Sequence, residues 1–363
     1  MTLADFLNKR ADTLSKAGRN IKDYRVFQFD HVPKEPIVRP EVQPLVDACM
    51  RYLATRIPNN LFIFGSRGSG KTLIVKRLAE LFLTRHSLNW IYVNCREHNT
   101  SFKILAHILG SSPRGNTLQE LWGRFLQAYK SLCILVLDEV DLMSEKDRRK
   151  DILYLVSRSS QNYMLVLLSN HPRFLDTLDL SIRSTLQPQL IHFKNYDAHQ
   201  LLQILQNRAQ EGLYAASEEL LGKIAALTTR FGNSDARVAI KTLYYAALEP
   251  IENVEEVFHR ARQDLIMDVL AHLDERCLLM LRAVAEAPEL FVKPVYSRYR
   301  ALSANHHVDP FSYSYFYTNL SYLQSIGLIL LFSTKVGRAY TKSIQLLFDR
   351  ELLDAIWKAR IGA

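Results

Sequence analysis

The chain has 363 residues and a formal net charge of +9 at pH 7, a length that predicts two or three domains. Hydrophobic residues make up 48% and charged residues 23%, which is typical of globular proteins and excludes disordered, collagen-like and coiled-coil chains. The excess of basic residues favours a polyanionic partner, most simply nucleic acid.

The cysteines and the N-terminal residues give no sign of a zinc site or a targeting signal. The spacing of Cys49, Cys95, Cys133 and Cys277 matches neither C-x-x-C nor a zinc pattern, so we expect reduced, mostly buried thiols. Residues 1–18 predict a short amphipathic helix rather than a signal peptide, and the longest apolar runs are too short for a membrane span. We therefore expect a soluble intracellular protein without a membrane partner.

Strands alternate with helices over the first half of the chain. A proline-containing lead-in segment and a helix near 41–56 precede the first strand. Buried strands are predicted at 60–65, 89–94, 133–137, 163–169 and 190–193, and helices at 71–86, 100–109 and 117–130. This alternation predicts a parallel sheet covered on both faces.

After residue 196 the predicted elements change. Helices are predicted at 197–209, 217–229, 234–248 and 254–273. Beyond residue 276 the pattern is helix, loop, helix, then two β-like runs at 326–332 and 343–348 around a basic turn. We expect three domains: an α/β base with its lead-in segment over 1–196, a helical domain over 197–272, and a C-terminal domain over 273–363.

A phosphate-binding loop is the strongest motif in the chain. The pattern G-x-x-x-x-G-K-[ST] lies between a predicted strand and a predicted helix, which is the context that this motif requires. Its glycines let backbone N–H groups approach phosphates, and the helix N-terminus adds the positive end of a dipole. We expect Lys71 to reach the β- and γ-phosphates and Thr72 to ligate Mg²⁺. The predicted ATP- or ADP-binding residues are Gly65, Ser66, Arg67, Gly68, Ser69, Gly70, Lys71 and Thr72.

Acidic residues follow the strand predicted at 133–137. Asp138, at the end of an apolar run, is typical of the carboxylate that orients Mg²⁺ in P-loop proteins. Glu139 is placed to activate the attacking water as a general base. Asp141 is interpreted as a helix N-cap or a structural partner rather than a metal ligand.

Asn170 ends the next buried strand, directly after Ser169. A polar side chain at this position can hydrogen-bond the γ-phosphate or the attacking water. The alternative is a turn-forming asparagine before His171 and Pro172. Because the other two motifs are present, we favour the catalytic sensor role for Asn170.

The order of these motifs resembles that of the AAA+ ATPases, and within them the archaeal and eukaryotic origin-recognition initiators and helicase loaders of the Orc/Cdc type. The resemblance covers nearly the whole chain. The stretch 100–110 is similar to the segment that follows the second strand in that family, and the helix within 117–130 occupies the place of the initiator-specific insertion.

The resemblance also assigns two arginines. Segment 230–243 is similar to the sensor 2 motif, with Ser234 in place of a glycine, so Arg237 is expected to approach the γ-phosphate from the helical lid. The family carries arginines before the last strand that reach a neighbour's nucleotide. Here Arg183 is the candidate for that trans role, one or two positions from the usual place, which puts trans-activated hydrolysis in doubt.

The C-terminal part resembles the winged helix of the same family. Residues 311–323 would be the recognition helix, with Phe316, Leu320 and Leu323 expected in the core because they form an i, i+4, i+7 stripe. The basic turn would be a wing on DNA, or else an ordinary solvated hairpin tip. The predicted wing residues are Lys335, Arg338 and Lys342.

The charge is not concentrated in this expected DNA reader. Residues 264–363 contain 11 Lys and Arg against 10 Asp and Glu, and residues 1–263 contain 35 against 27. We therefore expect a second DNA-contact surface on the ATPase part, first of all in the insertion region. Its candidate residues are Arg114, Arg124 and Lys130.

The resemblance implies an α/β AAA+ P-loop domain with a helical lid and a C-terminal winged helix. It implies a DNA replication initiator with slow ATP hydrolysis, with nucleotide state as a conformational switch. The implied partners are double-stranded origin DNA, an MCM-type replicative helicase and paralogous initiator subunits. The alternatives are an ADP-locked structural DNA binder, and an AAA+ helper ATPase of transposition or defence. The expected location is the cytoplasm, at the nucleoid, or the nucleus in a eukaryotic host.

Overall fold

The computed structural model describes residues 2–5, 7, 20–111, 115–144, 147, 149–248, 253–287, 291–336 and 339–360, without side chains for 334–336 and 339–341. The chain forms two compact units, Val32–Lys194 and Met1–His31 with Asn195–Ala363. The helix expected over 1–18 lies almost wholly outside the described residues. The division into three domains stays a prediction.

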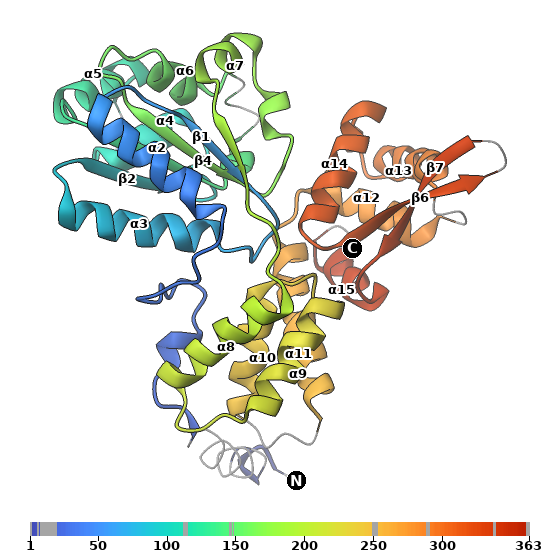
Figure 1. Ribbon diagram of the computed structural model, residues 1–363. Helices are drawn as coiled ribbons and strands as arrows, with labels where there is room; N and C mark the ends of the chain where they lie inside the picture. The colour runs from blue at the N-terminus through green and yellow to red at the C-terminus, as the bar shows by residue number, and fades with distance from the viewer. Residues whose placement is uncertain are drawn as a thin grey trace. The chain divides into compact units, whose positions relative to one another are not determined.

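The first unit contains a five-stranded parallel sheet (Figure 1). The strand order is β2-β3-β4-β1-β5, and every pairing between neighbours is parallel. The five predicted strands all form, with small differences at their ends. They are β1 (Leu61–Phe64), β2 (Asn89–Asn94), β3 (Cys133–Asp138), β4 (Met164–Ser169) and β5 (Gln189–His192).

Helices cover both faces of this sheet, because its central strands are apolar at every position. In β3, Ile134 and Val136 pack in one hydrophobic cluster, while Leu135 and Leu137 pack in another on the opposite face. Successive side chains of a strand point to opposite faces, so an unbroken apolar run requires two covers. The first cluster includes α2 (Val42–Thr55) and α3 (Lys71–Arg85), and the second includes α4 (Ser101–Ile108), α5 (Leu118–Ala128), α6 (Asp151–Ser157) and α7 (Leu180–Leu186).

The second unit begins its helical part with four helices, of which three share one apolar core and the fourth, with Phe258 and Leu265, packs on them through a smaller cluster. They are α8 (Ala198–Gly212), α9 (Glu218–Phe231), α10 (Ala236–Leu248) and α11 (Val254–Ala271). The lead-in residues belong to this core, since the ring of Phe27, in the short helix η2 (Tyr24–Phe27), packs in it. The buried guanidinium of Arg208 donates to the carbonyls of Val26 and His31 and fixes this segment against α8.

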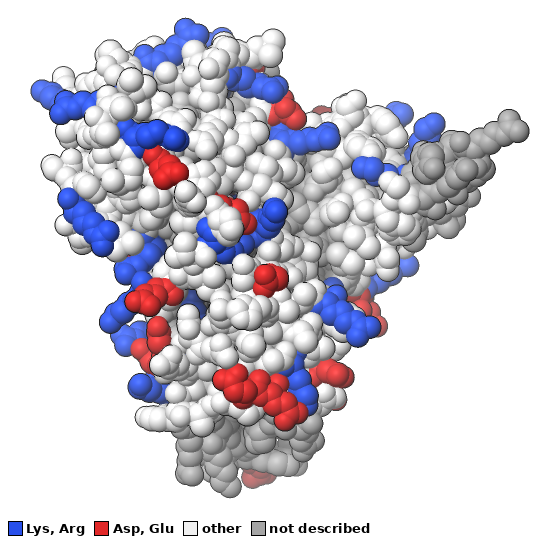
Figure 2. All heavy atoms as spheres, in the orientation of Figure 1, with Lys and Arg blue, Asp and Glu red and all other residues white. Residues whose placement is uncertain are grey.

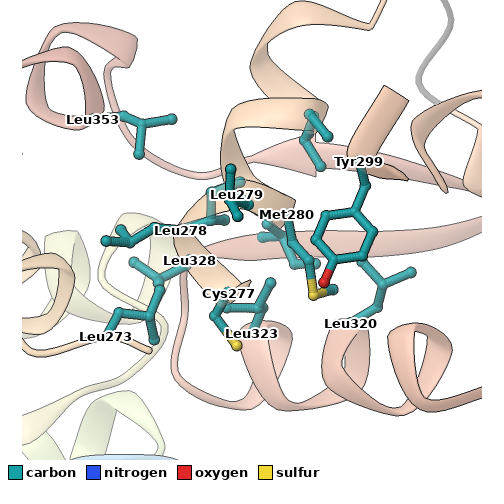
Figure 3. Packing of buried hydrophobic residues seen from close by; sticks show 14 of the residues in the cluster. Leu273, Cys277, Leu278, Leu279, Met280, Tyr299, Leu320, Leu323, Leu328 and Leu353 are labelled. Atoms are coloured by element: carbon teal, nitrogen blue, oxygen red, sulfur yellow. The ribbon is translucent and has the colours of Figure 1, made fainter. Parts of the chain in front are cut away.

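The C-terminal part of this unit has its own core, drawn in Figure 3. Phe316, Leu320 and Leu323 are fully buried there, as the stripe predicted. Tyr299 and Leu353 reach the same core from other helices. The elements are α12 (Glu275–Glu286), α13 (Val292–Asn305), α14 (Tyr313–Ser325), the antiparallel hairpin of β6 (Ile329–Val336) and β7 (Ala339–Leu346), and α15 (Arg350–Arg360). A three-helix core followed by a hairpin agrees with the expected winged helix.

Helix α11 joins the two parts of this unit. Its residues Ile266, Val269 and Leu270 belong to the C-terminal core, and the Arg262 guanidinium donates to the Leu347 carbonyl after β7. Arg360 at the end of α15 donates to the carbonyls of Leu270 and Leu273, the second at 2.7 Å. The four-helix part and the C-terminal part therefore share one helix.

Over the part of the chain that the structure describes, every helix is too short or too polar to cross a bilayer. All four cysteines are buried, and none of them forms a disulfide.

We predict that the four thiols are unreactive in the native protein. Burial raises the pKa of Cys49 and of Cys133 to about 12, so almost no thiolate forms at neutral pH, and the thiolate is the reactive form. Ellman's reagent at pH 8 should label the native chain far more slowly than the chain in guanidinium chloride, where all four cysteines should react. Rapid labelling of the native protein would contradict the assignment of these side chains to the core.

Candidate nucleotide-binding site

The loop between β1 and α3 has a backbone that requires glycine. Gly68 and Gly70 have φ of 72° and 86°, in the left-handed region that side chains disfavour. A Cβ atom on Gly65 would collide with the carbonyl group of Phe193, directly after β5. The glycines therefore let the loop turn tightly at the carboxyl edge of the sheet, where α3 begins at Lys71.

The ammonium group of Lys71 lies inside this loop and is 6% exposed. It donates to the carbonyl oxygens of Gly65 and Ser66, both at 2.8 Å, and to the side-chain oxygen of Asn170 at 3.0 Å. The Ser69 hydroxyl lies 3.4 Å away. These contacts hold the predicted phosphate-binding lysine at the centre of the loop, beside the tip of β4.

The carboxylate of Asp138 at the end of β3 is buried, at 4% exposure. Its Oδ2 accepts hydrogen bonds from the Thr72 hydroxyl at 2.7 Å and the Tyr92 hydroxyl at 2.6 Å. Its Oδ1 accepts from the Glu139 N–H at 2.8 Å. Burial raises the pKa of Asp138, and the hydroxyl and N–H donors oppose that rise.

These oxygens fit a magnesium ion. Mg²⁺ prefers oxygen ligands and is usually bound through one or two protein groups, waters and phosphate oxygens. The Thr72 hydroxyl and the Asp138 carboxylate touch each other at the mouth of the loop, and this is the donor set that such an ion needs. Among the described residues, His, Cys, Asp and Glu side chains do not gather in groups of three or more that could hold a metal.

Glu139 directly follows Asp138 and has a left-handed backbone, with φ 52° and ψ 41°. Its carboxylate pairs with the Arg96 guanidinium, with Nε 2.9 Å from one oxygen and Nη2 3.3 Å from the other. The predicted base is therefore bound in a two-point ion pair from the loop after β2.

Asp141 is a structural partner, one of the two roles expected for it. Its Oδ1 accepts from the Ser169 hydroxyl at 2.7 Å and from the Asn170 N–H at 3.1 Å. It does not cap the short helix η3 (Val140–Leu142), whose N-cap is Glu139. Asp141 thus fixes the end of β4, and with it the Asn170 side chain that contacts Lys71.

The remaining predicted site residues are the arginines Arg237, Arg183 and Arg67. Arg237 lies in the second unit at the start of α10, where its guanidinium pairs with Asp235. Arg183 in α7 is 44% exposed at its side chain and lies 3.4 Å from Asp176. Arg67 lies in the loop and is half-buried.

The predicted DNA-contact residues are described only in part. Arg124 and Lys130 are exposed, on α5 and just after it. The Lys342 ammonium lies 4.9 Å from the centre of the Tyr317 ring. Arg114, Arg338 and the side chain of Lys335 lie outside the described residues.

Three site residues escaped sequence reasoning: Tyr92, Arg96 and Arg39. The Arg39 guanidinium, 3% exposed, donates to the Ser69 carbonyl in the loop at 2.6 Å and to the Lys194 carbonyl at 2.8 Å. Tyr92 lies within the strand predicted at 89–94 and Arg96 just after it, but only the strand order of the structure shows that they lie next to the end of β3. For Arg39 the sequence offers no comparable signal.

Comparisons with known proteins agree with this architecture. Residues 56–178 match the family model described as AAA domain. The chain is 28% identical to the ORC1-type DNA replication protein 1 of Sulfurisphaera tokodaii over 96% of its own length and 95% of that protein's. It is 27% identical to the ORC1-type DNA replication protein of Thermococcus kodakarensis, over 94% and 92%.

Solved structures show the same fold. The ORC1 protein of Aeropyrum pernix, solved in complex with DNA, matches with a TM-score of 0.64 and 23% identity, over 94% of this chain and 97% of that one. Cdc6p of Pyrobaculum aerophilum matches with a TM-score of 0.58 and 21% identity, over 94% and 100%. The AAA+ fold class and the resemblance to the Orc/Cdc type, both expected from the sequence, are confirmed.

We predict that Gly65→Ala lowers the free energy of unfolding by about 1–3 kcal/mol, the usual cost of overpacking, because the new methyl group meets the Phe193 carbonyl. Gly123→Ala in α5 is the matched control, since its Cβ meets nothing within 4 Å. It should instead stabilise the chain by about 0.5–1 kcal/mol. Urea denaturation measures both, and equal effects would contradict the close approach at Gly65.

Proposed function

We propose, from its similarity to the Orc/Cdc-type AAA+ initiators, that this chain is an ATP-binding DNA replication initiator. It recognises origin DNA and helps to recruit or load the replicative helicase. The observation that carries the nucleotide part is the meeting of Lys71, Thr72, Asp138 and Asn170 at one edge of the sheet. The likeness to ORC1-type replication proteins over almost the whole chain supports the replication part.

In this proposal the loop 65–72 binds the phosphates of ATP or ADP. The backbone N–H groups of the loop and the N-terminus of α3 face the phosphates, and the Lys71 ammonium contributes the positive charge. Thr72 and Asp138 hold Mg²⁺, which supplies neutralisation of charge on the phosphate oxygens.

Glu139 is proposed as the general base, and its carboxylate takes the proton from the attacking water. The side-chain amide of Asn170, which contacts Lys71 in this structure, hydrogen-bonds the γ-phosphate or the attacking water. Arg237 contributes from the helical lid, so that nucleotide state sets the lid's position. To reach the nucleotide, the Arg237 guanidinium gives up part of its ion pair with Asp235.

Hydrolysis is proposed to be slow. Glu139 is paired with Arg96, so its carboxylate must separate from that guanidinium before it can take a proton from water. Arg183, the candidate for a trans arginine, is the one arginine between residues 174 and 193, so a complete pair of trans arginines is missing from that segment. The Arg96 ion pair also favours the second candidate function, an ADP-locked DNA-binding protein with negligible turnover.

DNA binding is proposed to use two surfaces. One is the hairpin of β6 and β7, where Lys335, Arg338 and Lys342 belong, and the other is the insertion region with Arg114, Arg124 and Lys130. Figure 2 shows Lys and Arg side chains spread over the face in view, with Asp and Glu between them, rather than gathered in one patch.

The proposed partners are double-stranded origin DNA, an MCM-type helicase and paralogous initiator subunits. The proposed location is the cytoplasm, at the nucleoid, or the nucleus in a eukaryotic host.

Two site variants test the ATPase. Lys71→Ala should weaken ATP binding about 10- to 100-fold, because hydrogen bonds to charged groups contribute about 1.5–3 kcal/mol. Glu139→Gln should keep ATP binding and lower single-turnover hydrolysis by about 10²-fold or more, as expected for loss of a general base. Glu80→Gln, on the exposed face of α3, is the control and should change neither quantity. If Glu139→Gln hydrolyses ATP at the wild-type rate, the ATPase proposal fails and the ADP-locked alternative takes its place.

DNA binding is tested by removing one charge from each proposed surface. Lys342→Gln and Arg124→Gln should each weaken binding to duplex DNA and reduce the slope of log K against log salt by about one, since each phosphate contact contributes about 0.9. Lys223→Gln, an exposed α9 residue paired with Glu219, should leave the slope unchanged. Footprinting on the host's own origin completes the test, and binding without sequence preference would overturn the initiator role in favour of an AAA+ helper.

A further inference from the structure

Asp138 has a hydrogen-bond partner that no sequence motif assigns. The Tyr92 hydroxyl donates to Oδ2 of Asp138 at 2.6 Å, the same oxygen that accepts the Thr72 hydroxyl at 2.7 Å. The other oxygen, Oδ1, accepts from the Glu139 N–H. Both oxygens of the carboxylate are thus held, and two hydroxyl groups converge on the one that faces Thr72.

The register of the sheet explains how Tyr92 reaches this carboxylate. Tyr92 lies opposite Val136 in the parallel pairing of β2 with β3, and Asp138 lies two residues further along. Residues two apart in a strand share a face, and a diagonal neighbour on the next strand is within reach of an aromatic side chain. Tyr92 therefore points along the sheet toward its carboxyl edge.

The Tyr92 ring has a cation beside it. The Lys76 ammonium, one turn into α3, lies 5.0 Å from the centre of the ring. A cation over the ring face attracts electron density from the phenol and strengthens its O–H as a donor.

We propose that Tyr92 is a positioning residue for the magnesium ion, holding the Asp138 carboxylate so that Oδ2 stays turned toward Thr72. This inference rests on the proposed ATP-binding function. A buried carboxylate with fewer donors can rotate or draw in other partners, and metal ions need their oxygen ligands in place. The hydroxyl of Tyr92 thus acts on the ion through Asp138 and does not touch the nucleotide itself.

A second tyrosine, Tyr52 in α2, offers a matched comparison because its hydroxyl also hydrogen-bonds a residue of β3. The Tyr52 hydroxyl is bonded to the backbone N–H and carbonyl of Cys133, at 3.0 and 3.1 Å, at the opposite end of β3. Tyr52 and Tyr92 both lose one hydrogen-bonding hydroxyl on substitution by Phe. Tyr52 holds the backbone at the start of the strand, whereas Tyr92 holds the metal-orienting side chain at its end.

The test measures ATP affinity with Mg²⁺ and with EDTA, by isothermal titration calorimetry, in the full-length chain. Tyr92→Phe should reduce the gain in affinity that Mg²⁺ provides by about tenfold, in line with the loss of one hydrogen bond to a charged group. Affinity in EDTA should stay within about twofold, because the Lys71 loop is untouched. Tyr52→Phe should leave both affinities unchanged.

Each other outcome has a defined meaning. If Tyr92→Phe and the wild type gain equally from Mg²⁺, or if Tyr92→Phe loses affinity equally in EDTA, Tyr92 is not a positioning residue. If it lowers the melting temperature much more than Tyr52→Phe does, its hydroxyl is a folding determinant, and the inference also falls. If the wild type binds no ATP under either condition, the proposed function itself fails.

Discussion

A buried ammonium group organises the site. Lys71 sits at the start of α3, almost without exposure to solvent, and a buried charge must be surrounded by oxygens to be tolerated. The loop supplies two backbone carbonyls, and Asn170, directly after β4, supplies its side chain. The loop conformation and the position of the β4 tip therefore both depend on this one group. Asp141 adds to the constraint because it fixes the backbone of Asn170.

The parallel sheet makes this arrangement possible. Because all five strands run the same way, their carboxyl ends meet at one edge, where ligands bind in open α/β sheets. The order β3-β4-β1 puts β4 between the two motif-bearing strands, so Asn170 lies between the loop and Asp138. The order alone thus brings together residues that are separated by up to about one hundred positions in the sequence. Arg39 adds a further tie, from the lead-in segment to the loop carbonyl of Ser69.

The sequence predicted what local pattern and motif spacing determine. The apolar run at 133–137 became β3, the predicted loop lies between β1 and α3, and the α14 stripe of Phe316, Leu320 and Leu323 is buried. It did not predict pairings that depend on tertiary placement, such as Arg96 with Glu139 across 43 positions or Arg39 with Lys194 across 155. A tyrosine or arginine in a strand or loop looks ordinary until the strand order is known. Helical periodicity predicted the helices between residues 197 and 248 closely, because each of them buries one apolar face.

The composition of α14 bears on how the proposed initiator would hold DNA. Its thirteen residues include tyrosines, serines, a threonine and an asparagine, but no lysine, arginine, aspartate or glutamate. Tyr313 and Tyr315 are exposed on it, while Phe316 and Leu320 face the core. A helix without charge can contact base edges through hydroxyl and amide groups, yet it contributes nothing to the electrostatic attraction that dominates affinity for duplex DNA. If α14 contacts the bases, basic residues outside α14 must bind the phosphates. The positive net charge, which lies in residues 1–263 and not in the nearly neutral residues 264–363, would then supply that attraction.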